Sequence, residues 1–373
     1  MEGLELMAER PRQAFWSGKR VLITGHTGFI GGWLSHALTS LGAKVSGYAD
    51  EVPTTPSLFE ATGLADLVTD HRGDIADASR VAEVFGRDQP EIVFHLAAQP
   101  LVRRAFRKPV ETYQANLMGT LAVLEGVRHA KSVAAAVFMT TDKVYLNKEW
   151  IWPYRETDEL GGHEPYGLSK AMAEMAIAQY RKTYFGGQGD AGGTARIVSV
   201  RAGNVFGGGD WSEDRLVPDA VRAWGSGQPL VIRSPQSTRP WQHVLEVADG
   251  LLMLAERAAS ASGATGAPLQ DAYNIGPDAA AVVPVGDLVQ RMSEKWGAGA
   301  DVRIETPQWQ APESKLLAVD SALLRQDFGW QPKFSLDKGL DMTIAWYRSV
   351  LRDPSSSRLI TQKQIAGLFD DQC

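Results

Sequence analysis

The feature that most constrains the fold is a glycine-rich turn between an apolar strand and a helix near the start of the chain. Residues 19–24 (KRVLIT) read as a short strand, and residues 33–41 have the period of an amphipathic helix. Between them, Gly25, Gly28 and Gly31 form the pattern GxxGxxG. Glycines at this spacing let the backbone turn tightly and approach a pyrophosphate, and the helix N-terminus offers unpaired N–H groups. The segment predicts a dinucleotide-binding turn, with a purely structural turn as the alternative.

Apolar strands alternate with amphipathic helices through the first half of the chain. Further apolar runs lie at 44–48, 91–98, 134–141 and 195–203, and helical patterns lie between them at 78–87, 110–128 and 169–185. Strands that are apolar on both faces and are separated by helices indicate a parallel sheet covered on both sides. We therefore predict an α/β fold with a Rossmann-type doubly wound parallel sheet.

The regular alternation of apolar strands and helices ends after residue 203. Glycine and proline become frequent, and the predicted elements are the helices 245–257 and 285–296 with the short strands 230–233 and 272–275. We predict a dinucleotide-binding domain over 1–203 and a smaller, mixed α/β substrate lobe over 204–373, with part of the second segment returning to the first domain. Open α/β sheets bind ligands at the carboxyl ends of their strands, so the lobe should close there.

Composition and charge argue against several other classes of protein. The formal net charge of −6 disfavours non-specific binding to nucleic acid or to an anionic membrane. The only cysteine is Cys373, and one thiol forms neither an intrachain disulfide nor a zinc cluster, so we expect no metal site. Residues 1–13 lack the apolar core of a signal peptide, and no apolar run approaches the roughly 20 residues that span a bilayer. We expect a cytoplasmic protein.

The end of the second strand bears on the choice of dinucleotide. NAD-binding folds usually place an acidic residue there to hold the ribose 2′-hydroxyl. Here Ala49 stands at that end and Asp50 comes one residue later, while no arginine within 44–70 is available for a 2′-phosphate. We therefore predict NAD rather than NADP. Asp74 and Ile75 are candidates to cap the adenine, although Asp74 also suits a simple turn.

A second motif, Tyr166-x-x-x-Lys170, suggests the chemistry. Four residues apart on a helix, the two side chains face the same way. An adjacent ammonium and a positive nicotinamide ring should lower the pKa of the phenol from its usual value near 10. Such a phenol can take a proton from a sugar hydroxyl while a hydride leaves the same carbon. A surface pair is the alternative, and the glycine-rich turn earlier in the chain argues against it.

Three further candidates, Thr141, Asp142 and Lys143, stand at the end of the predicted strand 134–141. The carboxyl end of a parallel strand is where active-site residues gather. Thr141 would position the substrate, and Asp142 and Lys143 would add acid and base groups. Away from such a strand end, an Asp-Lys dipeptide is usually a solvated loop pair.

Together these motifs resemble the extended short-chain dehydrogenase family over nearly the whole chain. The family's segments occur in order as TGHTGFIG (24–31), HLAAQ (95–99), NLMGT (116–120), TTDK (140–143), YGLSK (166–170) and RAGNVFGGGDW (201–211). Within that family the chain is similar to the CDP-glucose 4,6-dehydratases, chiefly because Lys143 stands where dehydratases of other nucleotide hexoses usually carry Glu. It departs from them at Ile30, Gly32 and Val144, where Lys, Ser and Cys are more common.

The resemblance implies NAD as cofactor, a CDP-hexose as substrate and a homodimer or homotetramer. The implied reaction oxidises C4 of CDP-glucose, removes water across C5–C6 and returns the hydride to C6, as in the supply of deoxysugars such as those of lipopolysaccharide O-antigen. The implied cofactor-binding residues are Gly25, Thr27, Gly28, Phe29, Ile30, Gly31, Asp74, Ile75, Ala97, Ala98, Asn116, Tyr166 and Lys170.

The resemblance also implies roles in the reaction. Tyr166 would deprotonate the 4-hydroxyl, Lys143 would help remove the C5 proton, and Asp142 would protonate the departing 6-hydroxyl. Candidate contacts to the substrate are Arg103, Asn204, Arg215, Arg239 and His243, because guanidinium groups bind phosphate oxygens in pairs. For each arginine, a surface ion pair is the alternative. A 4-epimerase or reductase on the same scaffold remains open, although an epimerase gains nothing from an Asp-Lys pair. A non-catalytic dinucleotide-binding subunit also remains open, and the intact Thr-Tyr-Lys set argues against it.

Overall fold

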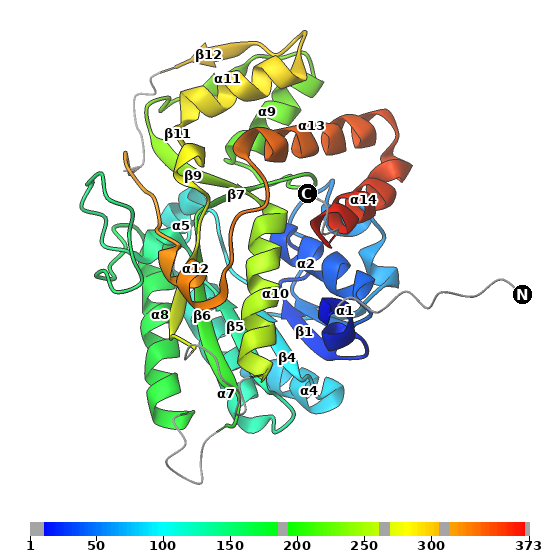
Figure 1. Cartoon of the computed structure of the whole chain (residues 1–373), viewed down its shortest axis with the longest axis vertical. Coiled ribbons are helices and arrows are strands. Elements are labelled where there is room, and N and C mark those ends of the chain that lie inside the picture. Colours follow the sequence, from blue (N-terminus) through cyan, green and yellow to red (C-terminus); the bar gives the residue numbers. More distant parts are fainter. Residues whose placement is uncertain (1–10, 186–192, 261–268, 306–313, 370–373) are drawn as a thin grey trace, which may run out of the picture.

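Seven parallel strands form the central sheet of the structure, a computed structural model that describes residues 11–185, 193–260, 269–305 and 314–369 (Figure 1). The strands are β1 (Arg20–Thr24), β2 (Lys44–Ala49), β3 (Thr69–Arg72), β4 (Ile92–His95), β5 (Ala135–Met139), β6 (Arg196–Ala202) and β10 (Ala272–Ile275). Their order is β10-β6-β5-β4-β1-β2-β3. The order reverses direction between β1 and β4, the place where such sheets bind ligands. The predicted doubly wound parallel sheet is confirmed.

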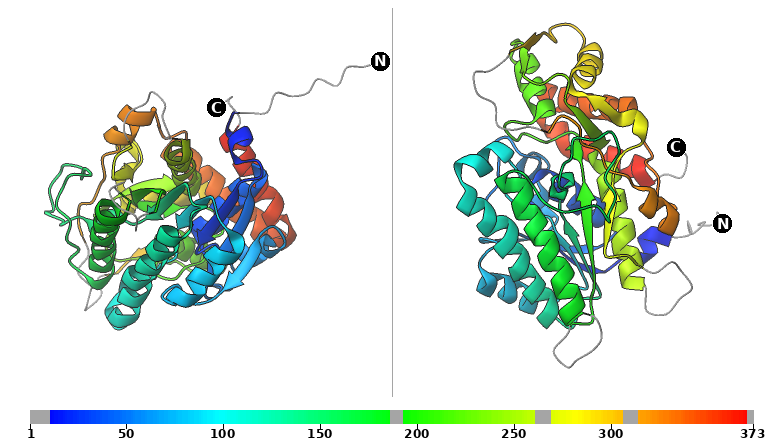
Figure 2. Two further views of the ribbon diagram at one scale, coloured as in Figure 1. Left: turned by 90° about the horizontal axis from the view of Figure 1, so that it is seen from below. Right: turned by 90° about the vertical axis from the view of Figure 1, so that its left-hand side faces the viewer.

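Helices cover both faces of the sheet, because successive strand residues point to opposite sides. Val21 and Ile23 of β1 enter one core cluster, and Leu22 enters the other. The first cluster is covered by α2 (Phe29–Ser40) and α10 (Val244–Ser260), with α14 (Ser357–Phe369) packed on α2. The second is covered by α4 (Ala78–Asp88), α7 (Gly119–His129) and α8 (Pro165–Tyr184), which lie side by side in Figure 2 as the blue-to-green helices.

A smaller lobe lies beyond the carboxyl ends of the strands, at the top of Figure 1. Its strands are β7 (Asn204–Phe206), β9 (Thr238–His243) and β11 (Val282–Pro284), in the order β11-β9-β7, and the pair β8 (Leu230–Ile232) and β12 (Val302–Ile304). Its helices are α9 (Leu216–Gly225), α11 (Val285–Trp296) and α13 (Leu336–Arg352). The chain after residue 203 also supplies β10 and α10 to the central sheet layers.

The remaining elements are short. They are α1 (Pro11–Trp16), α3 (Leu58–Ala61), α5 (Val102–Arg107), α6 (Pro109–Tyr113), α12 (Ala322–Phe328), η1 (Leu64–Asp66), η3 (Asp142–Val144), η4 (Ala279–Ala281) and η5 (Pro354–Ser356).

The helix predicted over 110–128 is interrupted. A π-helical segment, η2 (Gln114–Met118), separates α6 from α7. Its Asn116 side chain accepts the Gln99 N–H at 2.8 Å and donates to the Ser169 hydroxyl at 2.9 Å. Wide helical turns of this kind are rare in proteins overall, and those that occur often lie at functional sites. This one ties the segment after β4 to α8.

Candidate active site

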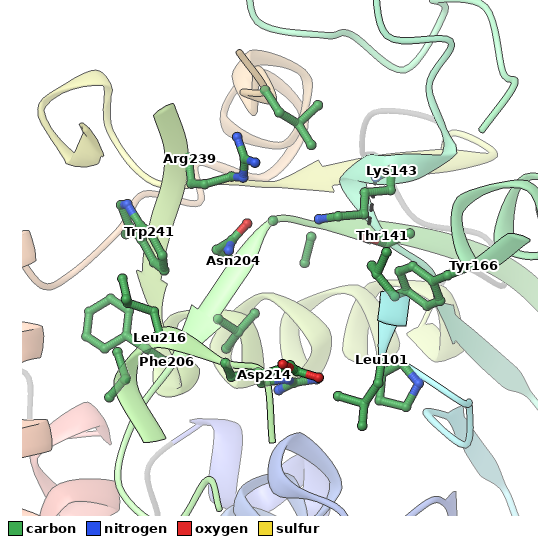
Figure 3. Close-up of a pocket in the computed structure, with 18 of the residues that line it drawn as sticks. Leu101, Thr141, Lys143, Tyr166, Asn204, Phe206, Asp214, Leu216, Arg239 and Trp241 are labelled. Atoms are coloured by element: carbon green, nitrogen blue, oxygen red, sulfur yellow. Dashed lines mark hydrogen bonds between the residues drawn. The ribbon is translucent and has the colours of Figure 1, made fainter. Parts of the chain in front are cut away.

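A pocket of about 480 Å³ lies at the carboxyl ends of β4 and β5, between the sheet and the smaller lobe (Figure 3). Its sheet side is lined by residues that include Ile30, Leu96, Ala98, Met139, Thr141, Lys143, Tyr166 and Lys170. Its lobe side includes Asn204, Phe206, Asp210, Asp214, Arg215, Arg239 and Trp241. The volume is in the range of sites that hold a small molecule.

The glycine-rich turn between β1 and α2 is packed too closely for side chains. Gly25 has φ +78°, and a Cβ there would lie 2.7 Å from the Ala97 nitrogen. A Cβ on Gly31 would lie 2.2 Å from the Gly25 carbonyl oxygen. Gly28, the N-cap of α2, supplies no side chain to pair the first N–H groups of that helix. These features fit a dinucleotide pyrophosphate, which would take the N–H groups at the helix N-terminus.

The other predicted cofactor residues fall into two sets. Ile30, Ala98, Tyr166 and Lys170 line the pocket. The rest lie around the turn or at the strand ends. The Thr27 hydroxyl donates to the Glu51 carbonyl at 3.0 Å. Phe29 packs against Gly207, and Ala97 packs against Gly25. Asn116 is fully buried. Asp74 is exposed after β3, and Ile75 is buried against Gly119, so these two residues do not line this pocket.

Thr141 is the centre of the sheet-side cluster. It ends the loop after β5, caps η3 and accepts the Lys143 backbone N–H at 3.3 Å. Its own hydroxyl proton goes to Asp142 Oδ1 at 3.0 Å. It also forms a side-chain hydrogen bond with Tyr166, so the hydroxyl, the phenol and the carboxylate are contiguous. Figure 3 shows Thr141, Lys143 and Tyr166 together on one side of the pocket, with Asn204, Arg239 and Trp241 on the other.

The pKa of Tyr166 bears on one prediction. Burial raises the pKa of the phenol to about 12, although the hydrogen bond with Thr141 and the nearby Arg215 act in the opposite direction. In the polypeptide alone, desolvation outweighs Arg215 and the Thr141 hydrogen bond. The predicted lowering also invoked the positive nicotinamide ring, and it stays a prediction for the NAD-bound protein. Lys170 Nζ donates to the Met139 carbonyl at 2.9 Å, and burial lowers the pKa of its ammonium to about 8.

Asp142 and Lys143 are adjacent in sequence but occupy different places. Lys143 lines the pocket, and its Nζ lies 3.5 Å from Asp142 Oδ1. Asp142 is 1% exposed and lies behind Thr141, outside the pocket lining. Its second oxygen, Oδ2, has no hydrogen-bond partner among the residues that the structure describes. The structure thus brings Thr141, Lys143 and Tyr166 to one wall and leaves Asp142 buried outside the pocket lining.

Sequence reasoning missed Glu164, which also lines the pocket. Its carboxylate caps α8 and accepts the N–H groups of Tyr166 and Gly167, each at 2.7 Å. Burial raises the pKa of Glu164, and Lys143 acts against that rise. An acidic residue directly before Pro165, the first residue of the helix, is a recognisable N-cap pattern and would have identified it.

Four predicted substrate residues face the pocket, and two of them already hold an anionic partner. Arg103 Nη1 lies 2.7 Å from Asp214 Oδ1, and Arg215 Nη1 lies 3.1 Å from Asp210 Oδ2. Arg239 donates to the Thr238 carbonyl at 2.9 Å. Asn204 Oδ1 is buried and has no partner within the described part of the chain. The arginines can therefore bind phosphate only by sharing or exchanging these contacts.

His243 is not part of the pocket, contrary to its predicted contact with the substrate. It lies in the core against the rings of Trp33, Phe206 and Phe334, and burial lowers its pKa to about 3. The β9 strand that contains it turns its side chain inward, where Nδ1 accepts the Leu245 N–H at 3.3 Å.

The described residues contain no group of three His, Cys, Asp or Glu side chains that could hold a metal ion. Cys373 lies outside these residues. Among the helices that the structure describes, none is long and apolar enough to cross a membrane.

Comparison with known proteins identifies the family. The model of the NAD dependent epimerase/dehydratase family matches residues 21–276. A CDP-glucose 4,6-dehydratase of Salmonella typhimurium is 42% identical over 338 residues, which are 91% of this chain and 93% of that protein. A dTDP-glucose 4,6-dehydratase of Xanthomonas campestris is 26% identical, with 87% and 92% of the two chains covered.

A solved structure has the same fold. The UDP-glucose 4-epimerase of Thermotoga maritima superposes with a TM-score of 0.75 at 23% identity, over 89% of this chain and 99% of the other. The sequence motifs, the parallel sheet and the match over most of the chain all indicate the same family. The chain belongs to the NAD dependent epimerase/dehydratase family, the extended short-chain dehydrogenases that its motifs resemble.

Proposed function

We propose that the chain is an NAD-dependent lyase that converts CDP-glucose to CDP-4-keto-6-deoxyglucose. The observation that carries the proposal is the pair of Lys143 in the pocket and Asp142 behind it, both in contact with the wall that holds Thr141 and Tyr166. Oxidation at C4 alone, as in an epimerase, needs Tyr166 and the cofactor but has no use for such a pair. The name of the Salmonella relative supports CDP-glucose as the substrate.

The residues of this chain divide the proton chemistry between them. Bound NAD would supply the hydride chemistry of the reaction, with C4 of the sugar as hydride donor and C6 as hydride acceptor. Tyr166 takes the proton of the 4-hydroxyl, Thr141 hydrogen-bonds the 4-oxygen, and Lys170 holds the cofactor ribose. The resulting ketone acidifies the C5 proton, which Lys143 removes. Asp142 is the source of the proton that leaves with the 6-hydroxyl.

The smaller lobe and α5 supply the contacts to the nucleotide part. Arg103, Arg215 and Arg239 line the pocket and are suited to the pyrophosphate. Asn204 offers an amide oxygen that has no partner among the described residues. We assign the cofactor to residues 1–203 and the sugar nucleotide mainly to 204–373.

We also propose that the protein acts in the cytoplasm as a homodimer or homotetramer. Support for self-association comes from α8, where Leu168, Met172 and Met175 are 38%, 39% and 53% exposed. Residues at this spacing form one helix face, and exposed apolar faces of this kind usually pack against another protein surface.

The experiment that tests the function is mass spectrometry of the products formed from CDP-, dTDP-, UDP- and GDP-glucose. We expect loss of one water from CDP-glucose and a 4-keto product, without added reductant. A product of unchanged mass would indicate an epimerase, and a net change of two hydrogens would indicate a dehydrogenase or reductase. Preference for another nucleotide would keep the reaction and overturn the CDP assignment.

A further inference from the structure

The carboxyl end of β2 lacks the acidic side chain that holds the adenosine ribose in most NAD-binding folds. Ala49 ends this strand, and its register partner on the neighbouring strand β3 is Arg72. Paired strands lie about 4.8 Å apart, so the side chain of Arg72 starts beside the position that usually carries the acid. In dinucleotide folds an acid at this edge binds the ribose 2′-hydroxyl, whereas an arginine nearby accommodates a 2′-phosphate. The residue at this edge is thus of the second type.

Arg72 lies on the same face of the sheet as α2, the helix that follows the glycine-rich turn. Val45 of β2 belongs to the core cluster that α2 covers. Side chains alternate along a strand, so Gly47 and Ala49 face the same side as Val45. Asp70 and Arg72 are the register partners of Gly47 and Ala49, and they share that face.

A series of contacts joins the glycine-rich turn to Arg72. His26, the residue after Gly25, covers Gly47, where a Cβ would lie 2.1 Å from the imidazole ring. His26 Nε2 donates to Asp70 Oδ1 at 2.9 Å, since a carboxylate only accepts. Asp70 Oδ2 accepts Arg72 Nε at 3.0 Å and Nη2 at 2.8 Å. The turn that fits a pyrophosphate is therefore connected to the guanidinium through two side chains.

The guanidinium of Arg72 is held in place and still has donors to offer. It lies 5.0 Å from the centre of the Phe59 ring, which is 5% exposed, and this stacking fixes its plane. The Arg72 side chain is 36% exposed, and its Nη1 makes no hydrogen bond within the described part of the chain. Nη1 and Nη2 both retain N–H groups, so they can bind two oxygens of one phosphate. A cation that is already ordered loses little entropy when it binds.

We propose that Arg72 binds the 2′-phosphate of NADP, and that the protein takes NADP as a second dinucleotide beside NAD. Ala49 neither attracts a 2′-hydroxyl nor repels a 2′-phosphate, so the strand end that usually rejects NADP does not do so here. The inference goes beyond the proposed function, because it concerns the adenosine half of the cofactor and not the sugar nucleotide that is converted.

The test is equilibrium binding by calorimetry, which needs no turnover, on the full-length protein after bound nucleotide has been removed. The ligands are NAD, NADP, AMP and adenosine 2′,5′-bisphosphate, which is the adenosine half of NADP. Arg72→Met keeps an unbranched stem over Phe59 and removes the guanidinium, and Arg72→Lys keeps a cation. The matched control is Arg325→Met on α12, because Arg325 is 41% exposed and lies 3.0 Å from Asp278 Oδ1.

We expect the unaltered protein to bind NADP within about tenfold of NAD, and to bind the bisphosphate more tightly than AMP. In Arg72→Met the affinity for NADP and for the bisphosphate should fall about 10- to 100-fold, the range for hydrogen bonds to a charged group. NAD and AMP should change by less than about threefold. Arg72→Lys should retain part of the NADP affinity, and Arg325→Met should bind all four ligands like the unaltered protein.

Other results overturn the inference. NADP that binds the unaltered protein more than about 100-fold more weakly than NAD would show that the site rejects the 2′-phosphate. Equal losses for NAD and NADP in Arg72→Met would show that Arg72 only supports this edge of the sheet. If Arg72→Met does not fold, the fragments decide on the unaltered protein, and AMP that binds as tightly as the bisphosphate contradicts the inference.

The last variant tests Asp50, the exposed residue directly after Ala49, as the alternative ribose contact. If Asp50→Asn weakens NAD and strengthens NADP by about tenfold each, Asp50 selects the dinucleotide and Arg72 does not. If Asp50→Asn leaves the ratio of the two affinities unchanged, the assignment to Arg72 is supported. These outcomes are independent of the product formed from CDP-glucose, so a failure here is distinct from a failure of the proposed function.

Discussion

A buried ion pair between Glu174 and Arg201 supports the strand ends that carry the site. Glu174 lies on α8, one turn after Lys170, and Arg201 lies on β6. Glu174 accepts a hydrogen bond from the Thr140 hydroxyl at 2.6 Å, from the Ser199 hydroxyl at 2.8 Å and from Arg201 Nη2 at 3.0 Å. The two charged side chains are 3% and 6% exposed. Since Thr140 precedes Thr141 directly, this network fixes the start of the catalytic loop.

Glu174→Gln is expected to destabilise the protein strongly. The amide keeps the size of the side chain and one acceptor oxygen for the hydroxyl donors. Arg201 stays charged, because a guanidinium does not lose its proton in a protein. A buried charge whose partner has been removed costs about 3 to 5 kcal/mol. A typical folded protein is stable by only about 5 to 15 kcal/mol, so this loss is a large part of the total.

The measurement is urea unfolding followed by tryptophan fluorescence, with Glu83→Gln as the matched control. Glu83 pairs with Arg80 on the surface of α4, where both side chains are more than half exposed. Exposed pairs contribute about 0 to 1 kcal/mol, so the control should unfold almost like the unaltered protein. If the two variants lose the same small amount of stability, the argument from burial is wrong.

The loss of stability in Glu174→Gln should depend on pH in a direction that follows from the pKa of Glu174. Burial alone raises the pKa of Glu174, but Arg201 and the two hydroxyl donors outweigh it and lower the pKa below its usual value. A lowered carboxylate pKa stabilises the fold above the unfolded value of about 4.3, and the stabilisation disappears as pH falls through the folded pKa. The difference between the unaltered protein and Glu174→Gln should therefore be constant near neutral pH and shrink below about pH 4.

Three further predictions concern catalysis. Tyr166→Phe should reduce turnover by about 10²–10⁴-fold while NAD stays bound, and a loss below about tenfold would show that Tyr166 is not the base. The purified protein should retain NAD and form product without net NADH, whereas NADH that accumulates with product would contradict a redox-neutral cycle. Asp214→Asn should free Arg103 from its ion pair and lower the KM for CDP-glucose by up to about fivefold with kcat unchanged. A higher KM would instead show that Asp214 positions Arg103.

The parts of the fold that were predictable are those set by neighbouring residues. The glycine-rich turn and the apolar runs beside it depend on spacing along the chain, and the predicted strand 44–48 is β2, Lys44–Ala49. The helix predicted from residue 169 begins at Pro165, because Glu164 caps it. β9 was not predicted, since Thr238–His243 reads as polar and contains Pro240. It is nevertheless largely buried, because β7 and β11 lie on either side of it.

In the candidate site, too, the features set by neighbouring residues were predictable and those set by distant segments were not. The motifs predicted that Thr141, Lys143 and Tyr166 lie close together, and the structure places all three in one pocket. The sign of the Tyr166 pKa shift was not predictable, because it depends on how completely distant segments cover the ring. The same is true of His243, whose place in the core is set by aromatic residues from α2, from β7 and from the segment before α13.

The arrangement of Asp142 and Lys143 gives a physical reason for a short acid–base pair at this position. Here the carboxylate is buried behind Thr141 and the amine lies in the pocket, 3.5 Å away. The amine can therefore reach a sugar bound in the pocket, while its partner carboxylate stays outside the pocket lining.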